Sequence, residues 1–209
     1  MKKIALLIFA FCITSTQAQS AKELLDEVSK KVKSYDNIVI GFKYALNNPA
    51  ENVSQETRGD VTLKGNKYLL NLMGTQQIFD GKKLHVIIPE DEEINISSLT
   101  EDDNSVTPAK MLTFYEEGYS YKMDIVQDVK GRKIQFVKLT PIDTKSELKE
   151  ILLGIDKQTK HIYKMILIQN NGTNVTITIN SFKTNQQLSE TLFVFNESKY
   201  ENYYINRLD

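Results

Sequence analysis

Cysteine and histidine are scarce in this sequence. Cys12 is the single cysteine among 209 residues, and it lies inside an apolar run near the N-terminus. The rest of the chain can form no disulfide and offers no thiol nucleophile or thiolate metal ligand. The two histidines, His85 and His161, have no H-x-x-x-H partner, which argues against a zinc site. We therefore expect no metal and no cofactor.

Catalytic motifs are also missing. The sequence contains neither a G-x-S-x-G nucleophile elbow nor a G-x-x-x-x-G-K-[ST] phosphate loop. Neighbouring carboxylates occur in acidic turns such as Glu90 to Glu93, where solvent keeps carboxyl groups close to their ordinary behaviour. The sequence predicts a protein that is not an enzyme. Carboxylates that only the fold brings together leave a hydrolase as the alternative.

The chain has no excess of charge of either sign. Lys and Arg number 26 against 27 Asp and Glu, which gives a formal net charge of -1. Such a balance lacks the basic footprint of a nucleic-acid-binding protein. Hydrophobic residues make up 41% of the chain, enough for a sizeable core in one domain of ordinary size.

The first 18 residues have the pattern of a secretory signal peptide. Lys2 and Lys3 precede an apolar run from Ile4 to Ile13, and Thr16-Gln17-Ala18 forms a small-x-small cleavage site. The run is too short for a membrane span, although an N-terminal anchor is the alternative. We expect residues 19–209 to form a single exported domain in a bacterial periplasm. Its net charge would be -3, because -1 minus the two lysines is -3.

Residues Thr57 to Ile96 are typical of an antiparallel meander. Apolar and polar residues alternate in short stretches, which are separated by Gly65-Asn66 and by Asp80-Gly81, a strong hairpin signal. Strands with the same alternation are expected at Ile38 to Leu46 and in several stretches between Tyr119 and Ile179. Local pairing of about ten to twelve such strands favours one antiparallel sheet with an apolar face that needs a cover.

Two segments are predicted to be helical. Ser20 to Tyr35 places Leu24, Val28 and Val32 on one face at helical spacing. Thr107 to Glu117 has an N-cap threonine followed by proline and ends at Gly118, which predicts a helix of about three turns. This second helix is either a buried core element or a lid over a cavity.

Two stretches of the meander, GDVTLKGNKYLLNL and IFDGKKLHVIIPEDEEI, resemble the core of the LolA-type periplasmic lipoprotein carriers. The resemblance continues through VTPAKML, KLTP and LGIDKQTKHIYKMIL, and it covers most of the mature chain. It implies an α+β fold that is mainly β: an open, strongly curved antiparallel sheet, or incomplete barrel, covered by an N-terminal helix and short lid helices around an apolar cavity. The family's arginine-proline pair after the lysine matching Lys64 is replaced here by Gly65 and Asn66, so the family's lid-locking arginine is not carried over.

The alternation and the resemblance together define a candidate site for acyl chains. Its expected lining residues are Phe42, Tyr44, Val61, Leu63, Leu70, Leu72, Leu84, Val86, Tyr121 and Met123, with Met111, Leu112 and Phe114 as the lid. Alternation shows which residues share a face but leaves open which face is inside.

The resemblance implies a monomeric periplasmic carrier that moves acylated lipoproteins from the inner to the outer membrane. Its expected partners are the lipoproteins, an inner-membrane ABC-type releasing complex and an outer-membrane acceptor, without nucleic acid. Two alternatives stay open. One is a carrier or sensor of another lipid or glycolipid on the same fold, and the other is a structural or adaptor domain whose own side chains fill the cavity.

Overall fold

The computed structural model describes residues 20–98 and 107–208. The signal peptide predicted for residues 1–18 lies outside these ranges. The chain is mainly β, with one α-helix at residues 20–33 and three short 3-10 helices, η1 (Lys110–Leu112), η2 (Phe114–Glu116) and η3 (Glu197–Lys199). No helix in the described residues is both long and apolar enough to cross a membrane.

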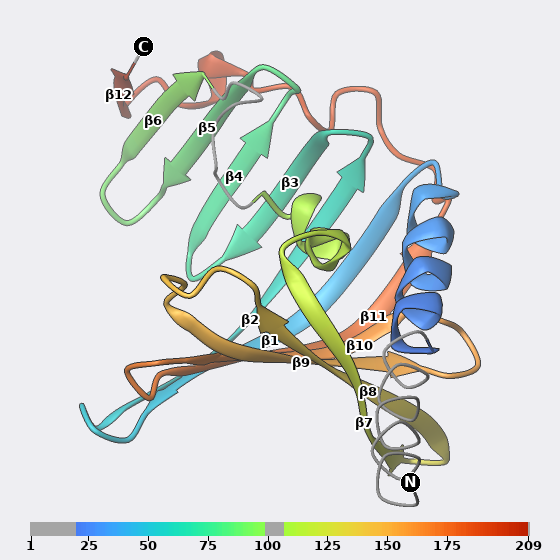
Figure 1. Cartoon of the computed structure of the whole chain (residues 1–209). Coiled ribbons are helices and arrows are strands. Elements are labelled where there is room, and N and C mark those ends of the chain that lie inside the picture. The colour runs from blue at the N-terminus through green and yellow to red at the C-terminus, as the bar shows by residue number, and fades with distance from the viewer. Residues whose placement is uncertain (1–19, 99–106, 209) are drawn as a thin grey trace, which may run out of the picture. The chain divides into compact units, whose positions relative to one another are not determined.

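The strands belong to one open sheet in the order β12-β6-β5-β4-β3-β2-β1-β11-β10-β9-β8-β7 (Figure 1). Their bounds are β1 (Ile38–Asn48), β2 (Val53–Lys64), β3 (Lys67–Leu72), β4 (Thr75–Phe79), β5 (Lys83–Ile88), β6 (Glu93–Ser98), β7 (Tyr119–Val129), β8 (Arg132–Pro141), β9 (Leu148–Asp156), β10 (Ile162–Gln169), β11 (Asn174–Thr184) and β12 (Tyr204–Arg207). Neighbours along the chain pair antiparallel within each meander, whereas β12 pairs parallel to β6. The expected α+β fold, mainly β with an open antiparallel sheet, is confirmed.

The chain divides into two compact units. The helix unit contains the α-helix up to Ser34 together with residues 45–55 and 113–178, and the meander unit contains residues 35–44, 56–112 and 179–209. Strands β1, β2 and β11 contribute residues to both units.

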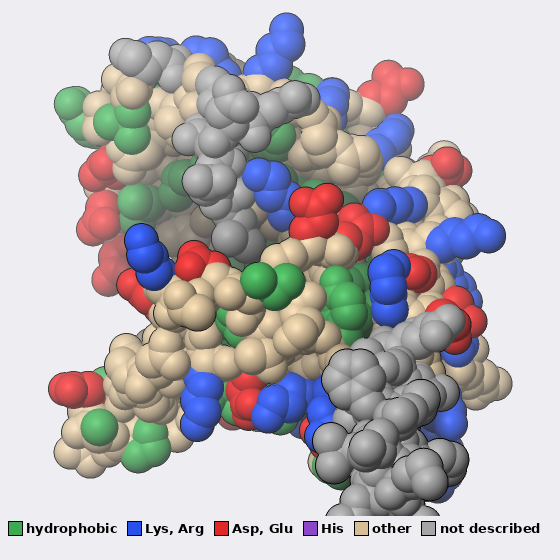
Figure 2. All heavy atoms as spheres, in the orientation of Figure 1, with side chains coloured by type: hydrophobic (Ala, Val, Ile, Leu, Met, Phe, Trp, Pro, Cys, Tyr) green, Lys and Arg blue, Asp and Glu red, His purple; other side chains and the backbone are tan. Residues whose placement is uncertain are grey.

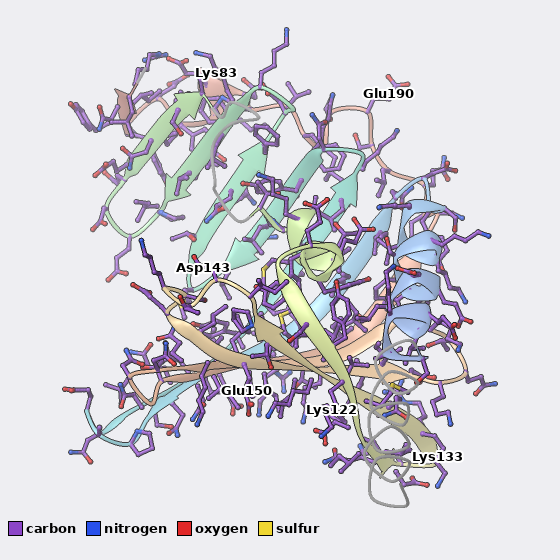
Figure 3. All side chains as sticks on the ribbon, in the orientation of Figure 1. Lys83, Lys122, Lys133, Asp143, Glu150 and Glu190 are labelled. Atoms are coloured by element: carbon purple, nitrogen blue, oxygen red, sulfur yellow. The ribbon has the colours of Figure 1, made fainter. Side chains whose placement is uncertain are left out.

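The helix unit is built around β8 and β9, whose residues are buried in nearly continuous runs. The helix directs Ala21, Leu25 and Val28 inward. Its buried face is therefore shifted from the predicted one, because Leu24 and Val32 are only half-buried. Its polar residues hold it in place: Lys31 Nζ donates to the carbonyl oxygen of Thr159 at 2.7 Å, and Lys160 Nζ lies 2.7 Å from a Glu27 carboxylate oxygen. Figure 3 shows the charged side chains of Lys122, Lys133 and Glu150 at the surface of this unit.

The meander unit follows the predicted hairpins. Asp80 Oδ1 accepts from the backbone amides of Lys82 and Lys83, each at 2.8 Å, which closes the β4–β5 turn at Asp80-Gly81. Gly81 has φ of +100°, a conformation that favours glycine over any residue with a Cβ. The registers of β2 to β6 follow without interruption from these short turns.

Two helix predictions need correction. The helix predicted for Thr107 to Glu117 is instead two 3-10 turns, η1 and η2, because Thr113 between them has φ -136° and ψ 4° and breaks the helical path. Two separate turns bury Leu112 and Tyr115 without forcing four bulky apolar side chains into one helical stripe. The N-terminal helix also ends at residue 33, two residues earlier than predicted.

Candidate functional site

The strand registers gather most of the predicted lining residues on one face of the meander unit, called here the predicted face. Val61 lies opposite Leu70, Leu70 opposite Gln77, and Gln77 opposite Val86, so these four side chains form a row across β2 to β5. Leu63, Tyr68, Phe79 and Leu84 form the neighbouring row in the same way. Leu72, opposite Gly59, extends the face at the other end.

Phe42 of β1 joins this face through a gap that Gly59 leaves. A Cβ atom on Gly59, on the side of Val61, would lie 2.6 Å from Phe42 Cζ and 2.7 Å from the carbonyl oxygen of Asn71. A side chain there would displace the aromatic ring, so glycine is required at this position. Tyr44 follows Phe42 at the strand period and shares its face.

The opposite face of the same strands is covered by the C-terminal segment. Ile78, Ile87, Ile94 and Ile96 form a buried cluster against Phe195, Tyr200, Tyr203 and Ile205. The His85 ring stacks on Phe195 at a centroid distance of 4.5 Å, and Phe195 stacks on Tyr200 at 5.5 Å. His85 therefore points away from Leu84 and Val86, as the alternation predicted, and it serves packing on this covered side.

The predicted face is buried in one part and half-buried in another. Val61, Leu63, Tyr68 and Phe79 are 2% to 7% exposed. Leu70, Leu72, Leu84 and Val86 are half-buried, whereas Ile87 and Ile94 on the opposite face are 2% and 0% exposed. Figure 2 shows hydrophobic side chains at the surface near the acidic β5–β6 turn. An apolar face with incompletely buried leucines is suited to binding a hydrocarbon group.

A cleft of about 440 Å³ lies at one end of this face, beside the turn between β3 and β4. Gly59, Leu72 and Thr75 line it from the predicted face, and Arg58 and Asp60 line it from the other side of β2. Its volume falls within the range of small-molecule sites, about 300 to 1,000 Å³. The end of the apolar face is thus bordered by polar groups.

The remaining predicted residues lie elsewhere. Tyr121 and Met123 are on β7 and Phe114 is on η2, all in the helix unit, whereas Met111 and Leu112 are on η1 in the meander unit. The Tyr121 hydroxyl donates to the carbonyl oxygens of Tyr115 at 2.8 Å and Glu116 at 3.2 Å. Tyr121 therefore supports η2, a role that its alternation pattern did not indicate.

A polar contact that sequence reasoning missed joins η2 to the N-terminal helix. The Glu116 carboxylate accepts hydrogen bonds from Ser29 Oγ and Lys33 Nζ. These two bonds hold the pKa of Glu116 below its ordinary value, and the bond from Lys33 has the larger effect. Tyr115 beside it is 1% exposed and its hydroxyl makes no hydrogen bond within the described residues; burial raises its pKa.

No metal site is found in residues 20–98 and 107–208, which contain no group of three or more His, Cys, Asp or Glu side chains able to hold an ion. The chemistry available on the predicted face is apolar contact together with a few amide and hydroxyl groups. This arrangement is compatible with contact to an apolar ligand on one face of the open sheet.

The family model described as outer membrane lipoprotein carrier protein LolA matches residues 33–196. The chain belongs to this family. No curated protein matches the sequence.

Solved structures with the same fold are distant in sequence. An uncharacterized conserved protein from Thermus thermophilus superposes with a TM-score of 0.55 at 11% identity, over 90% of this chain and 99% of that one. The Mycobacterium tuberculosis lipoprotein LppX gives a TM-score of 0.52 at 12% identity, over 82% of this chain and 98% of that one. At these identities the likeness shows a shared fold.

Proposed function

We propose that this protein binds the acyl chains of lipoproteins on the predicted face and carries them across the periplasm from the inner to the outer membrane. The observation that carries the proposal is that Leu70, Leu84 and Val86 are half-buried on one face of the meander unit, whose opposite face is covered by the chain's own C-terminal segment. Membership of the lipoprotein carrier family supports the same ligand.

The energetics of acyl binding set a condition on the carrier. Burying one methylene stabilises a complex by about 0.8 kcal/mol, so a chain of roughly 14 methylenes gains up to about 11 kcal/mol. A lipoprotein with several chains would then be released too slowly unless loading disrupts an existing contact. The η1 segment with Met111 and Leu112 belongs to the same unit as the face and is our candidate for the lid that loading displaces.

The direction of transport implies two protein partners. We propose that an ABC-type complex in the inner membrane supplies the lipoprotein and that an acceptor at the outer membrane receives it. Binding and release of this kind need no bond to be made or broken, so the proposed role is that of a non-enzymatic chaperone.

A competition titration tests the ligand class. The purified protein is loaded with an apolar fluorescent probe and challenged with a triacylated lipopeptide, the same peptide without acyl chains, and a diacyl phospholipid. We expect the lipopeptide to displace the probe and the unacylated peptide to leave it bound. Displacement by both lipids would instead indicate a general lipid carrier, and a protein that takes up no probe would be a packed domain, which contradicts the proposal.

A pair of variants locates the binding face. Leu84→Asn introduces an amide on the predicted face and should weaken probe binding at least about tenfold, because a polar group in an apolar site must be desolvated. Ile142→Asn makes a similar change at a position that is 67% exposed in the helix unit and should leave binding unchanged. Equal effects of the two variants would show that the probe binds elsewhere.

A further inference from the structure

Strand β4 carries three consecutive polar side chains, and their surroundings differ. Thr75 Oγ1 donates to the carbonyl oxygen of Leu72 at 2.8 Å, and Gln76 Nε2 donates to Asn71 Oδ1 at 3.0 Å. The side chain of Gln77 makes no hydrogen bond to any part of the chain that the structure describes. Of the three, Gln77 alone has a side chain without a hydrogen-bond partner in the described residues.

Gln77 occupies the centre of the predicted face. Its cross-strand neighbours are Leu70 on β3 and Val86 on β5, both apolar and half-buried. Phe79, two residues along on the same face, is 7% exposed. An apolar side chain would suit this position, because a half-buried amide loses part of its hydration and here gains no hydrogen bond within the described residues. The glutamine therefore needs a reason other than packing.

Tyr68 is a second residue with a polar atom on the same face of the sheet. Tyr68 lies opposite Phe79 and Leu70 lies opposite Gln77, so Tyr68 and Gln77 are diagonal neighbours, typically about 7 to 8 Å apart at their backbones and within reach of long side chains. Tyr68 is 2% exposed, and its hydroxyl makes no hydrogen bond in residues 20–98 or 107–208. Burial raises the pKa of Tyr68, so the hydroxyl keeps its proton and can donate.

We propose that Gln77, assisted by Tyr68, binds the carbonyl oxygen of the ester or amide that joins an acyl chain to its head group. This inference rests on the proposed function and assigns a specificity-determining residue within it. A hydrocarbon chain has no acceptor for these donors, and its first acceptor is the carbonyl at the head end. Apolar sites commonly orient a ligand through a few such polar groups. Gln77 thereby sets the depth at which the acyl chain lies on the face.

The test compares an ester-linked diacyl lipid with the ether-linked dialkyl lipid of the same chain length and head group. The ether lipid lacks both carbonyls but retains the hydrocarbon. Dissociation constants are measured by displacement of an apolar probe for the original protein and for Gln77→Leu. We expect the original protein to prefer the ester lipid about three- to tenfold, the effect of one hydrogen bond, and Gln77→Leu to bind both lipids about equally.

Matched variants separate this role from general effects on the sheet. Gln76→Leu makes the same change one residue away on the opposite face and should keep the ester preference, while Tyr68→Phe should reduce it in part. Circular dichroism checks that each variant remains folded. An unchanged ester-to-ether ratio in Gln77→Leu, or the same loss in Gln76→Leu, would overturn the inference while leaving the acyl-binding role in place. A protein that binds neither lipid would overturn both.

Discussion

The two units use their apolar residues differently. The largest fully buried side chains in the described residues come from the helix unit, at Val28, Tyr115, Ile134, Val137, Leu139, Ile151, Leu153 and Ile155, whereas the meander unit contributes Ile94. Ile94 belongs to the face that the C-terminal segment covers. The predicted face of the meander unit adds none to this group.

The two units nevertheless share one packing device. In the helix unit, a Cβ on Gly154 would lie 2.9 Å from Phe136 Cε1, much as a Cβ on Gly59 would meet Phe42 in the meander unit. A glycine opposite an aromatic ring lets the ring lie flat on the sheet. The same device packs Phe136 in the core of the helix unit and Phe42 on the predicted face of the meander unit, which is our proposed ligand site. We infer that the helix unit supplies stability and the meander unit supplies the ligand site.

The largest expected loss of unfolding free energy comes from replacing one leucine in each unit by alanine. Leu153→Ala empties a fully buried position in the helix unit and should cost about 2 to 5 kcal/mol of unfolding free energy. Leu70→Ala removes a half-buried side chain and should cost about 1 kcal/mol, because less apolar area returns to water. Urea unfolding measures both, and equal losses would remove the proposed difference between the units.

A smaller loss of unfolding free energy is expected when Gly59 and Gly154 are replaced by alanine. Gly59→Ala and Gly154→Ala each force a methyl group against an aromatic ring and should cost about 1 to 3 kcal/mol. Probe binding separates the units: Gly59→Ala should also weaken binding because it displaces Phe42, whereas Gly154→Ala should leave binding intact. Adding Phe42→Leu to Gly59→Ala should recover part of the lost stability. Weakened binding in Gly154→Ala would contradict the division of roles.

Removing the hydroxyl of Tyr115 and that of Tyr121 should change the unfolding free energy in opposite directions. Tyr115→Phe removes a buried hydroxyl that has no hydrogen bond in the described residues, and it should raise the unfolding free energy by about 1 kcal/mol. Tyr121→Phe removes bonds to two carbonyl oxygens of η2 and should lower it by about the same amount. Thermal unfolding of the two variants checks the signs, and a loss in Tyr115→Phe would show that its hydroxyl has a partner.

The sequence predicted the meander in detail because its signals are local. The turn at Asp80-Gly81 sets the register of β4 and β5, and period-2 alternation placed Leu84 and Val86 on one face. Leu70 joins them through the turn at Met73-Gly74, which the sequence analysis did not predict. Alternation alone treats both faces alike, so it did not show which one the C-terminal segment covers. Gln77 was recognisable in principle, as a polar residue at an apolar position of the pattern.

Contacts between distant parts of the chain were not predictable in this way. Ser29 and Glu116 are 87 residues apart in the sequence, and no local pattern joins them. The aromatic residues Phe195, Tyr200 and Tyr203 cover the sheet as an irregular segment, which has no period to recognise. The two turns η1 and η2 replaced a helix because burial of Leu112 and Tyr115 outweighed a good N-terminal start signal.

The smallest expected effect concerns the contact between η2 and the N-terminal helix. The hydrogen bonds from Lys33 and Ser29 lower the pKa of Glu116. They therefore stabilise the fold fully at pH values above 4.5, the ordinary glutamate pKa, and this stabilisation is lost as the pH falls through the lower pKa of the folded protein. The Glu116 side chain is 38% exposed, and solvent screening limits the contribution to no more than about 1 kcal/mol. Glu116→Gln should therefore lower the urea midpoint slightly at pH 7, and the difference should shrink in acid below pH 4.5. Glu117→Gln, its exposed neighbour, is the control. A difference that persists unchanged into strong acid would mean that the carboxylate charge is not what holds η2 to the helix.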